Sequence, residues 1–551
     1  MKQFIQSLFL GCGLLYLSSP GAFAQDYFAH EKPGWLSKAE ENKPAISYKT
    51  ISPSGLVNIV KDETAFQGWK SVPGQPLDSL YKTSFKNKSG VVVDFGNHLT
   101  GYFSFSVGAI RGVPDAPLRF KLSFGEVPAE VMTPFDPYNG SLSRAWLQDE
   151  IIHVTELPAT ITVQRRLSFR YVKIELLGSS PYFDFGIHHL ECKAGSSVTT
   201  EVAPLLPTAD PRIAAIDKVG LNTLKECMQT VYEDGPKRDR RLWIGDLYLE
   251  SISNAYSFQN NQLTKRCFYL LAGLTDKDGF LPSNVFETPK PHPQTGAPFL
   301  FEYSLHFNSS LKEYLVSSGD TQTARELWPV AKRQLDNINK YLLPNGLFDN
   351  EAAAANRWWI FVDWKENLDR QASLQGIIIF SLKQTYELAR LLGKEKELSG
   401  VPALIKKMTA AARIQLFDKQ RNLFVSGKQQ QVSYASQAWM VLAGVVNEKE
   451  SKQVFQALGQ EKEVVRPGSP YLYHYYIEAM IKAGMGAEAK KALLDYWGGM
   501  VQKGADTFWE VYDPANDFLS PYNFYPINSY CHAWSCTPVY FIRKYPAIFQ
   551  Q

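Results

Sequence analysis

The pattern of apolar and polar residues changes character near residue 205. Before it, short alternating or β-branched runs separated by Gly, Pro and Asn predict antiparallel strands. The clearest runs are residues 91–95, 101–107, 118–124, 151–154 and 171–176. Such a series is typical of a β-sandwich, to which we assign residues 25–205. The stretch 203–211 contains three prolines and predicts a linker.

Beyond the linker, the apolar positions recur with helical spacing. Ile378, Leu382, Ala389 and Leu392 follow this period, and Gly393 stands where a helix would end. Helix, short glycine-containing turn and second helix recur around residues 318–320, 392–394 and 483–485. Helical hairpins over residues 206–551 favour a closed double ring, an (α/α)6 barrel or six-hairpin toroid, over an open superhelical array. Function would lie in the long loops at one end of the ring.

The N-terminus has the pattern of a secretory signal peptide. Met1-Lys2 is basic, residues 4–16 are largely apolar, and Ala22-Phe23-Ala24 offers the small residues of a cleavage site. We therefore expect residues 1–24 to be removed before Gln25, and the mature chain to be secreted, periplasmic or at the outer surface. The apolar run is too short for a permanent membrane span, and we expect no integral membrane segment after cleavage.

The composition limits the classes of molecule that we expect the protein to bind. A net charge of +3 gives no reason to expect nucleic acid, whereas an aromatic content of 13% is compatible with carbohydrate binding. Five cysteines remain after cleavage, scattered and odd in number, which argues against a disulfide framework. Cys531 and Cys536 are close enough in sequence to pair if the geometry allows. No cluster has zinc-ligand spacing, so we expect neither a metal nor a cofactor.

Four segments concentrate residues that could carry chemistry. A charged loop at 233–246 leads into a helix near Leu242, and the others are residues 504–510, 358–364 and 531–535. Each alone could be a solvated or satisfied polar site. Together they supply separated carboxylates and aromatic walls, which glycoside hydrolysis requires: one carboxylic acid protonates the leaving oxygen and a second carboxylate activates water or attacks. Mutual repulsion among Asp234, Asp239 and Asp246 could raise one pKa, opposed by Arg238 and Arg240.

These segments resemble glycoside hydrolase family 78, the α-L-rhamnosidases. Its motif, approximately Asp-x-Pro-x-Arg-Glu/Asp-Arg followed by Trp-x-Gly-Asp, is similar to residues 234–246, and its Gly-Ala-Thr-Ser-x-Trp-Glu segment is similar to residues 504–510. Residues 361–364 and 531–535 follow in the family's order. Residues 94–101 and 169–172 look like the domain that precedes the family's barrel. The resemblance covers about residues 90 to 545.

The resemblance implies an inverting mechanism with Asp239 as general acid and Glu510 as general base. Inversion needs carboxyls about 6.5–9.5 Å apart, with room for a water. The residues expected to line the sugar site are Asp234, Arg238, Asp246, Trp359, Asp363, Trp364 and His532. The implied partner is an oligosaccharide or glycoside that carries terminal α-L-rhamnose, and the oligomeric state stays open.

The chain departs from the family in two ways. Many members have Glu where this chain has Asp239, and many carry a C-terminal β-sandwich that we do not expect here, which leaves the substrate open. A different terminal sugar is therefore an alternative, either another deoxy-hexose or a uronic acid, which Arg238, Arg240 and Arg241 could attract. A second alternative is a carbohydrate-binding protein on a degenerate barrel. Acidic residues at both catalytic positions argue against degeneration.

Overall fold

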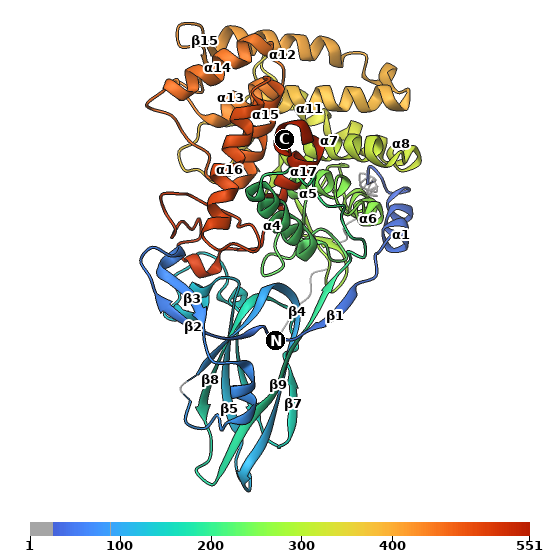
Figure 1. Cartoon of the computed structure of the whole chain (residues 1–551). Coiled ribbons are helices and arrows are strands. Elements are labelled where there is room, and N and C mark those ends of the chain that lie inside the picture. Colours follow the sequence, from blue (N-terminus) through green and yellow to red (C-terminus); the bar gives the residue numbers. More distant parts are fainter. Residues whose placement is uncertain (1–25, 89) are drawn as a thin grey trace, which may run out of the picture.

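The computed structural model describes residues 26–88 and 90–551. An antiparallel β domain lies at one end of the molecule and a helical domain at the other (Figure 1). The expected signal peptide falls outside the described residues. Within those residues, no helix is long and apolar enough to cross a membrane.

The β domain is a sandwich whose two layers share one long strand, β4. The first half of β4 pairs with β2 and β8, and the second half pairs with β7 and β9, all antiparallel. Phenylalanines dominate the core between the layers, among them Phe103, Phe120 and Phe169. The strands are β1 Ser47–Ile51, β2 Gly55–Lys61, β3 Trp69–Pro73, β4 Val91–Gly112, β5 Leu118–Gly125, β6 Asp149–Val154, β7 Ala159–Thr162, β8 Leu167–Gly178 and β9 Phe183–Ser196.

A bulge in β4 explains why two predicted strands are one. The register with β8 shifts between Asp94 and Leu99. Gly96 there has φ 81°, and a Cβ at this position would lie 2.4 Å from the Ser54 hydroxyl oxygen. The glycine therefore lets the strand bend and continue, where the sequence pattern indicated a turn.

The helical domain consists of two concentric layers of helices, which confirms the predicted (α/α)6 barrel. From α5 to α15 the inner helices pack side by side in chain order. The 3-10 turn Ala533–Cys536 and α17 then close the ring between α15 and α5. The inner helices are α5 Ile244–Ala255, α7 Phe301–Ser318, α11 Gln371–Leu392, α13 Tyr434–Leu442, α15 Pro470–Lys482 and α17 Pro538–Lys544. The outer helices are α4 Pro211–Cys227, α6 Asn261–Gly273, α8 Thr321–Gln334, α12 Val401–Gln415, α14 Glu448–Gln460 and α16 Gly486–Gln502.

The three predicted glycine turns are confirmed. Gly319, Gly393 and Gly484 end α7, α11 and α15 with φ of 72°, 67° and 70°. This left-handed conformation costs glycine little, because it has no Cβ. Each turn reverses the chain so that an outer helix packs against its inner partner.

The N-terminal part of the described chain, which the sequence assigned to the sandwich, packs on the helical domain. Helix α1, Lys32–Glu41, packs on α6 of the helical domain. Arg266 of α6 donates to the Ala39 carbonyl at 2.7 Å, and Lys38 pairs with Glu326 of α8 at 2.5 Å. The sandwich proper therefore begins at β1.

The five described cysteines are free and buried. Cys531 faces Cys227 across a sulfur–sulfur distance of 3.9 Å. This is nearly twice the length of a disulfide bond, and Cys531 and Cys536 do not pair.

Candidate active site

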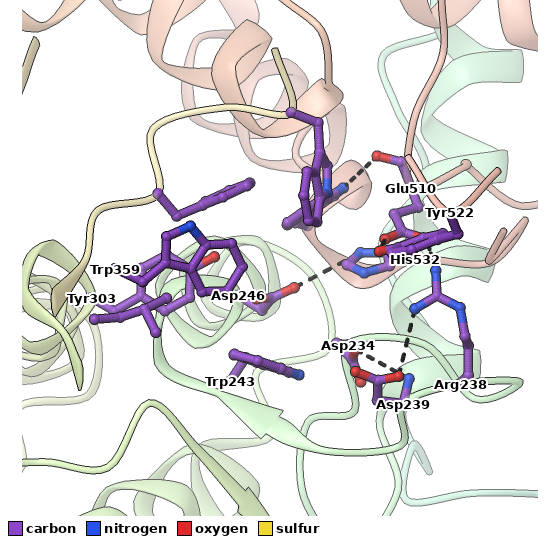
Figure 2. Close-up of a pocket in the computed structure, with 14 residues that line it drawn as sticks. Asp234, Arg238, Asp239, Trp243, Asp246, Tyr303, Trp359, Glu510, Tyr522 and His532 are labelled. Atoms are coloured by element: carbon purple, nitrogen blue, oxygen red, sulfur yellow. Dashed lines mark hydrogen bonds and ion pairs between the residues drawn. The ribbon is translucent and has the colours of Figure 1, made fainter. Parts of the chain in front are cut away.

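A pocket opens among the loops at one end of the helical ring (Figure 2). Its empty volume, part of which is open to solvent, is about 380 Å³. All but one of the predicted site residues line it, together with residues that the sequence did not single out. The lining consists of Asp234, Arg238, Asp239, Trp243, Asp246, Leu300, Tyr303, Trp359, Phe361, Trp364, Glu510, Tyr522, His532 and Trp534.

The loop between α4 and α5 is closed by the side chain of Asp234. Its two carboxylate oxygens accept hydrogen bonds from the backbone N–H groups of Asp239 and Arg241, at 3.2 and 3.1 Å. A Cβ on Gly235 would lie 2.4 Å from the Ser529 hydroxyl oxygen, so the loop packs tightly on the segment around Ser529. This folding turns Asp239 toward the pocket.

Arg238 connects the two predicted catalytic carboxylates. Its guanidinium is ion-paired with Glu510 and lies 3.5 Å from an Asp239 oxygen (Figure 2). Its Nε donates to the Ile527 carbonyl at 2.7 Å. Burial alone would lower the pKa of Arg238, but the combined Coulomb attraction of Glu510 and the neighbouring acidic groups raises it. Arg238 therefore stays charged and holds the carboxylates on either side of one guanidinium.

Glu510 is buried and held by three donors. Besides Arg238, the Tyr522 hydroxyl donates to Oε1, and the Ser529 backbone N–H donates to Oε2 at 3.2 Å. The backbone N–H of Glu510 also donates a hydrogen bond to the Ser529 carbonyl at 2.9 Å. Tyr522 has no counterpart in the motifs of the sequence, and only the fold brings it beside Glu510.

Two further carboxyls lie deeper in the pocket. Burial, with the charge of Asp239 as the next cause, raises the pKa of Asp234 to about 8. Burial and the neighbouring Asp234 raise the pKa of Asp246 well above its usual range. His532, whose Nδ1 lies 3.8 Å from an Asp246 oxygen, has a pKa lowered well below its usual range by burial and by Arg238. These shifts favour the neutral form of all three groups, in which they can donate to or accept from sugar hydroxyls.

The other arginines of the motif are placed differently from Arg238. Arg240 turns away from the pocket, and donates to the carbonyls of Pro236 and Arg166 at 2.8 and 2.7 Å. Arg241 lies 3.4 Å from an Asp239 oxygen but stacks over Phe286, outside the pocket lining. Asp239 is thus faced by Arg238 and Arg241, whereas the sequence suggested Arg238 and Arg240.

Aromatic side chains form the wall opposite the carboxyls. Phe361 and Trp534 are stacked at 5.8 Å with 12° between their planes, and Trp359 lies 6.2 Å from Trp364. Such rings can cover the C–H face of a sugar. Trp243 and Trp534 stood in the quoted motifs without a role, whereas Tyr303 and Leu300 carried no sequence signal.

Asp363 is the predicted site residue that does not line the pocket. Its carboxylate accepts from the Gly468 N–H at 2.6 Å and from the Ser469 hydroxyl at 2.5 Å. It therefore ties the loop that carries Trp364 to the start of α15. The segment after Trp359 is irregular, so Phe361 and Trp364 face the pocket while Asp363 points toward the start of α15.

No group of three or more His, Cys, Asp or Glu side chains in the described part of the chain could hold a metal ion. The pocket lining offers carboxyls, tyrosine hydroxyls and an imidazole. Two carboxylates separated by a guanidinium, beside an aromatic wall, can transfer protons to and from a sugar and its leaving group.

Two family models match most of the chain. Residues 53–194 match the family model of the glycosyl hydrolase family 78 alpha-rhamnosidase N-terminal domain. Residues 203–545 match that of the bacterial alpha-L-rhamnosidase six-hairpin glycosidase domain. A search of curated protein sequences found no match.

Among solved structures, a rhamnosidase from Klebsiella oxytoca with rhamnose bound is 40% identical, with a TM-score of 0.90 over 93% of this chain and 99% of that one. A family 78 rhamnosidase of Bacillus sp. GL1 is 20% identical, with a TM-score of 0.67 over 82% of this chain and 46% of that one. An alpha-L-rhamnosidase from Streptomyces avermitilis complexed with L-rhamnose is 14% identical, with a TM-score of 0.63 over 91% of this chain and 44% of that one. The last two show a shared fold.

Proposed function

Because the chain belongs to glycoside hydrolase family 78, the α-L-rhamnosidases, we propose that it removes terminal α-L-rhamnose by inversion, with Asp239 as general acid and Glu510 as general base. The observation that carries this proposal is the pair of ion pairs made by Arg238. Both carboxylates contact one guanidinium, and both line one pocket.

Glu510 suits the role of base because its surroundings stabilise a negative charge. The positive charge of Arg238 and the donors from Tyr522 and Ser529 all point at its two oxygens. Oε2 accepts from both Arg238 and Ser529, whereas Oε1 accepts from Tyr522, so the second lone pair of Oε1 is available to a water. In an inverting reaction Glu510 removes a proton from that water as it attacks the anomeric carbon.

Asp239 suits the role of acid by position. It lies on the other side of the Arg238 guanidinium, and its backbone N–H is fixed by Asp234. The tight loop compensates for the shorter side chain of Asp compared with Glu, since the backbone itself is held toward the pocket. In the reaction Asp239 gives its proton to the glycosidic oxygen as the bond to the anomeric carbon breaks.

The pocket favours a neutral deoxy-sugar over a uronic acid. Among its described lining residues, Arg238 is the single arginine or lysine, and it is already paired with Glu510 and Asp239. A substrate carboxylate would therefore meet four carboxyl groups and no available cation. The aromatic wall offers an apolar surface to a C6 methyl group, and the small volume suits one terminal sugar, hence exo action.

Export remains part of the proposal. The signal pattern of residues 1–24 supports a mature protein that begins at Gln25 in the periplasm or outside the cell. Expression in a bacterium, followed by cell fractionation and N-terminal sequencing, tests this. Recovery of the uncleaved chain from the cytoplasm would contradict it.

The catalytic proposal is tested with an aryl α-L-rhamnoside, with the product anomer followed by NMR. We expect wild type to release the inverted sugar, and Asp239→Asn and Glu510→Gln to lose at least about 10²-fold in rate with an unchanged unfolding temperature. Retained configuration would overturn inversion. Release of another sugar alone from a glycan panel would overturn the rhamnose assignment, and tight glycan binding without hydrolysis would indicate a binding protein.

A further inference from the structure

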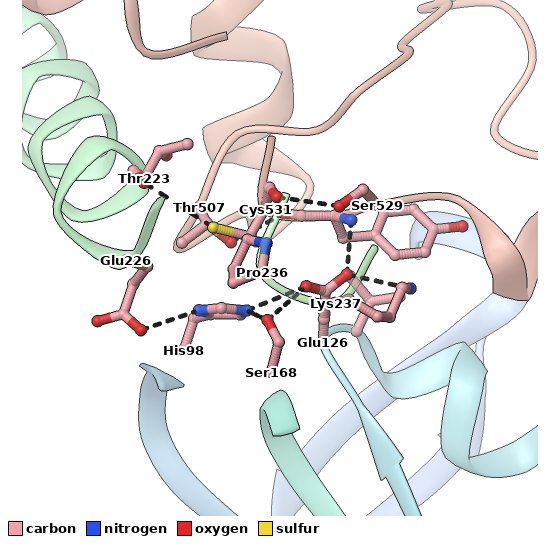
Figure 3. A network of polar contacts seen from close by, with 12 residues as sticks. His98, Glu126, Ser168, Thr223, Glu226, Pro236, Lys237, Thr507, Ser529 and Cys531 are labelled. Carbon is pink, nitrogen blue, oxygen red and sulfur yellow. Dashed lines mark hydrogen bonds and ion pairs between the residues drawn. The ribbon is translucent and has the colours of Figure 1, made fainter. Parts of the chain in front are cut away.

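A buried polar network joins the sandwich to the loop that carries Asp239 and to the segment that holds Glu510 (Figure 3). Its centre is Lys237, 2% exposed, in the loop that carries Asp239. The ammonium group donates to Glu130 of α3, Pro128–Met132, at 2.6 Å and lies 3.1 Å from Glu126, at the end of β5. Both acidic residues belong to the sandwich. A lysine of the loop that carries Asp239 is thus held between the two domains, by two carboxylates of the sandwich and by the Pro526 carbonyl of the helical domain at 3.3 Å.

Glu126 also contacts the segment that holds Glu510. One of its oxygens accepts the backbone N–H of Tyr530 at 2.6 Å, and this same oxygen faces Lys237. Tyr530 follows Ser529, whose backbone N–H and carbonyl both bond to Glu510. A single carboxylate oxygen of the sandwich therefore touches the acid loop and the base segment.

The sandwich holds Glu126 in a fixed orientation. Its other oxygen accepts from the Ser168 hydroxyl at 3.0 Å and lies 3.1 Å from His98 Nε2 (Figure 3). Ser168 and His98 stand on β8 and β4, which are neighbouring interior strands of the sheet. The backbone N–H of His98 in turn donates to Asp506, in the segment before Glu510, at 2.7 Å.

Stability alone does not account for this arrangement. Buried ion pairs can often be replaced by apolar residues of similar volume without loss of stability, because charges are costly to desolvate. Apolar residues cannot fix the orientation of neighbouring polar groups. Glu126 can, because it accepts hydrogen bonds from several segments at defined angles. Proton transfer in the pocket depends on such placement, since a displacement of about 1 Å can cost about 10²-fold in rate.

We propose that Glu126 is a positioning residue of the active site, which fixes the acid loop through Lys237 and the base segment through Tyr530. The sandwich is then a working part of the catalytic centre, although none of the proposed acid, base or sugar-binding residues belongs to it. This inference rests on the proposed roles of Asp239 and Glu510.

The test compares Glu126→Gln and Lys237→Met with a matched control, Asp217→Asn. Asp217 is also a buried, ion-paired carboxylate, bonded to Arg543 at 3.0 and 2.7 Å. These contacts involve neither the loop that carries Asp239 nor the segment that carries Glu510. For each full-length variant we would measure the unfolding temperature, and kcat and KM on rhamnosides with good and poor leaving groups. Asp239→Asn and Glu510→Gln are measured alongside.

We expect Glu126→Gln to lower kcat by about 10- to 100-fold, with KM nearly unchanged, whereas Asp217→Asn lowers only the unfolding temperature. Lys237→Met should lose more on the poor leaving group, because that substrate depends most on the acid. The double variant should be no worse than the poorer single variant. Glu126→Gln with wild-type kcat, or with losses that match the control, would overturn the inference. Full activity of Asp239→Asn or Glu510→Gln would instead overturn the proposed roles.

Discussion

The guanidinium of Arg238 lies over the ring of Tyr522, 4.3 Å from its centroid. Both side chains also contact the carboxylate of Glu510, one as an ion pair and the other as a hydroxyl donor. A buried cation over an aromatic face is stabilised by about 2 kcal/mol. The two groups that orient Glu510 therefore also orient each other.

Removal of the Tyr522 hydroxyl tests this arrangement. Tyr522→Phe keeps the ring under Arg238 but removes one of the donors to Glu510, so we expect kcat to fall about 10-fold with KM little changed. Tyr525→Phe is the matched control, because its hydroxyl bonds to Thr133 at 2.6 Å and lies outside the pocket. Equal kcat values for the two variants would show that the hydroxyl of Tyr522 does not matter.

Trp359 should contribute to binding more than to the chemical step. It lines the pocket and is half-buried, away from the two carboxylates. We expect Trp359→Ala to raise KM about 10-fold and to change kcat less, since the contact is made equally in the ground and transition states. The neighbouring Trp358 packs on Phe301 and Tyr341 instead, so Trp358→Ala should lower the unfolding temperature without this KM change. Steady-state kinetics on both variants decides.

Asp363→Ala should act on stability. The substitution leaves the Gly468 N–H and the Ser469 hydroxyl without their acceptor, at a cost of about 1–3 kcal/mol for a buried donor. We expect a lower free energy of unfolding in urea and a small change in KM. A large rise in KM with unchanged stability would restore the substrate contact that the sequence suggested.

Glu302 makes stability depend on pH. Burial raises its pKa to about 8, so the folded protein keeps a proton that the unfolded chain loses near pH 4.5. Its stabilising contribution is complete below pH 4.5 and is lost as pH rises toward 8. We expect the free energy of unfolding to fall less steeply over this window in Glu302→Gln, by up to about 1.4 kcal/mol per pH unit. Gln keeps the acceptor for the Phe361 N–H. Parallel pH curves for variant and wild type would refute the assignment.

The sequence predicted the parts of the fold that depend on local pattern. Strand alternation, helical spacing and Gly319, Gly393 and Gly484 follow from backbone chemistry that nearby residues decide. The packing of α1 on the helical domain was missed, because it depends on contacts such as that of Arg266 with the Ala39 carbonyl, more than 200 residues apart.

The candidate site likewise contains residues that the local sequence could identify and residues that only the fold brings together. Asp239 and Glu510 stand in dense motifs and could be named from the sequence. Tyr522 could not, since it reaches Glu510 through an irregular loop that has no periodicity. The direction of a side chain is likewise invisible in the motif: Arg240 and Asp363 stand beside pocket residues and yet turn away.

The double ring of helices also affects when, during synthesis of the chain, the site can form. Asp239 precedes α5 and Glu510 follows α16, so almost the whole ring separates them along the chain, and they meet where its last helices pack against α4 and α5. A chain emerging from the ribosome therefore carries the proposed general acid long before the proposed general base is synthesised. Both carboxylates come to face one guanidinium only when the last helices have packed and the circle has closed.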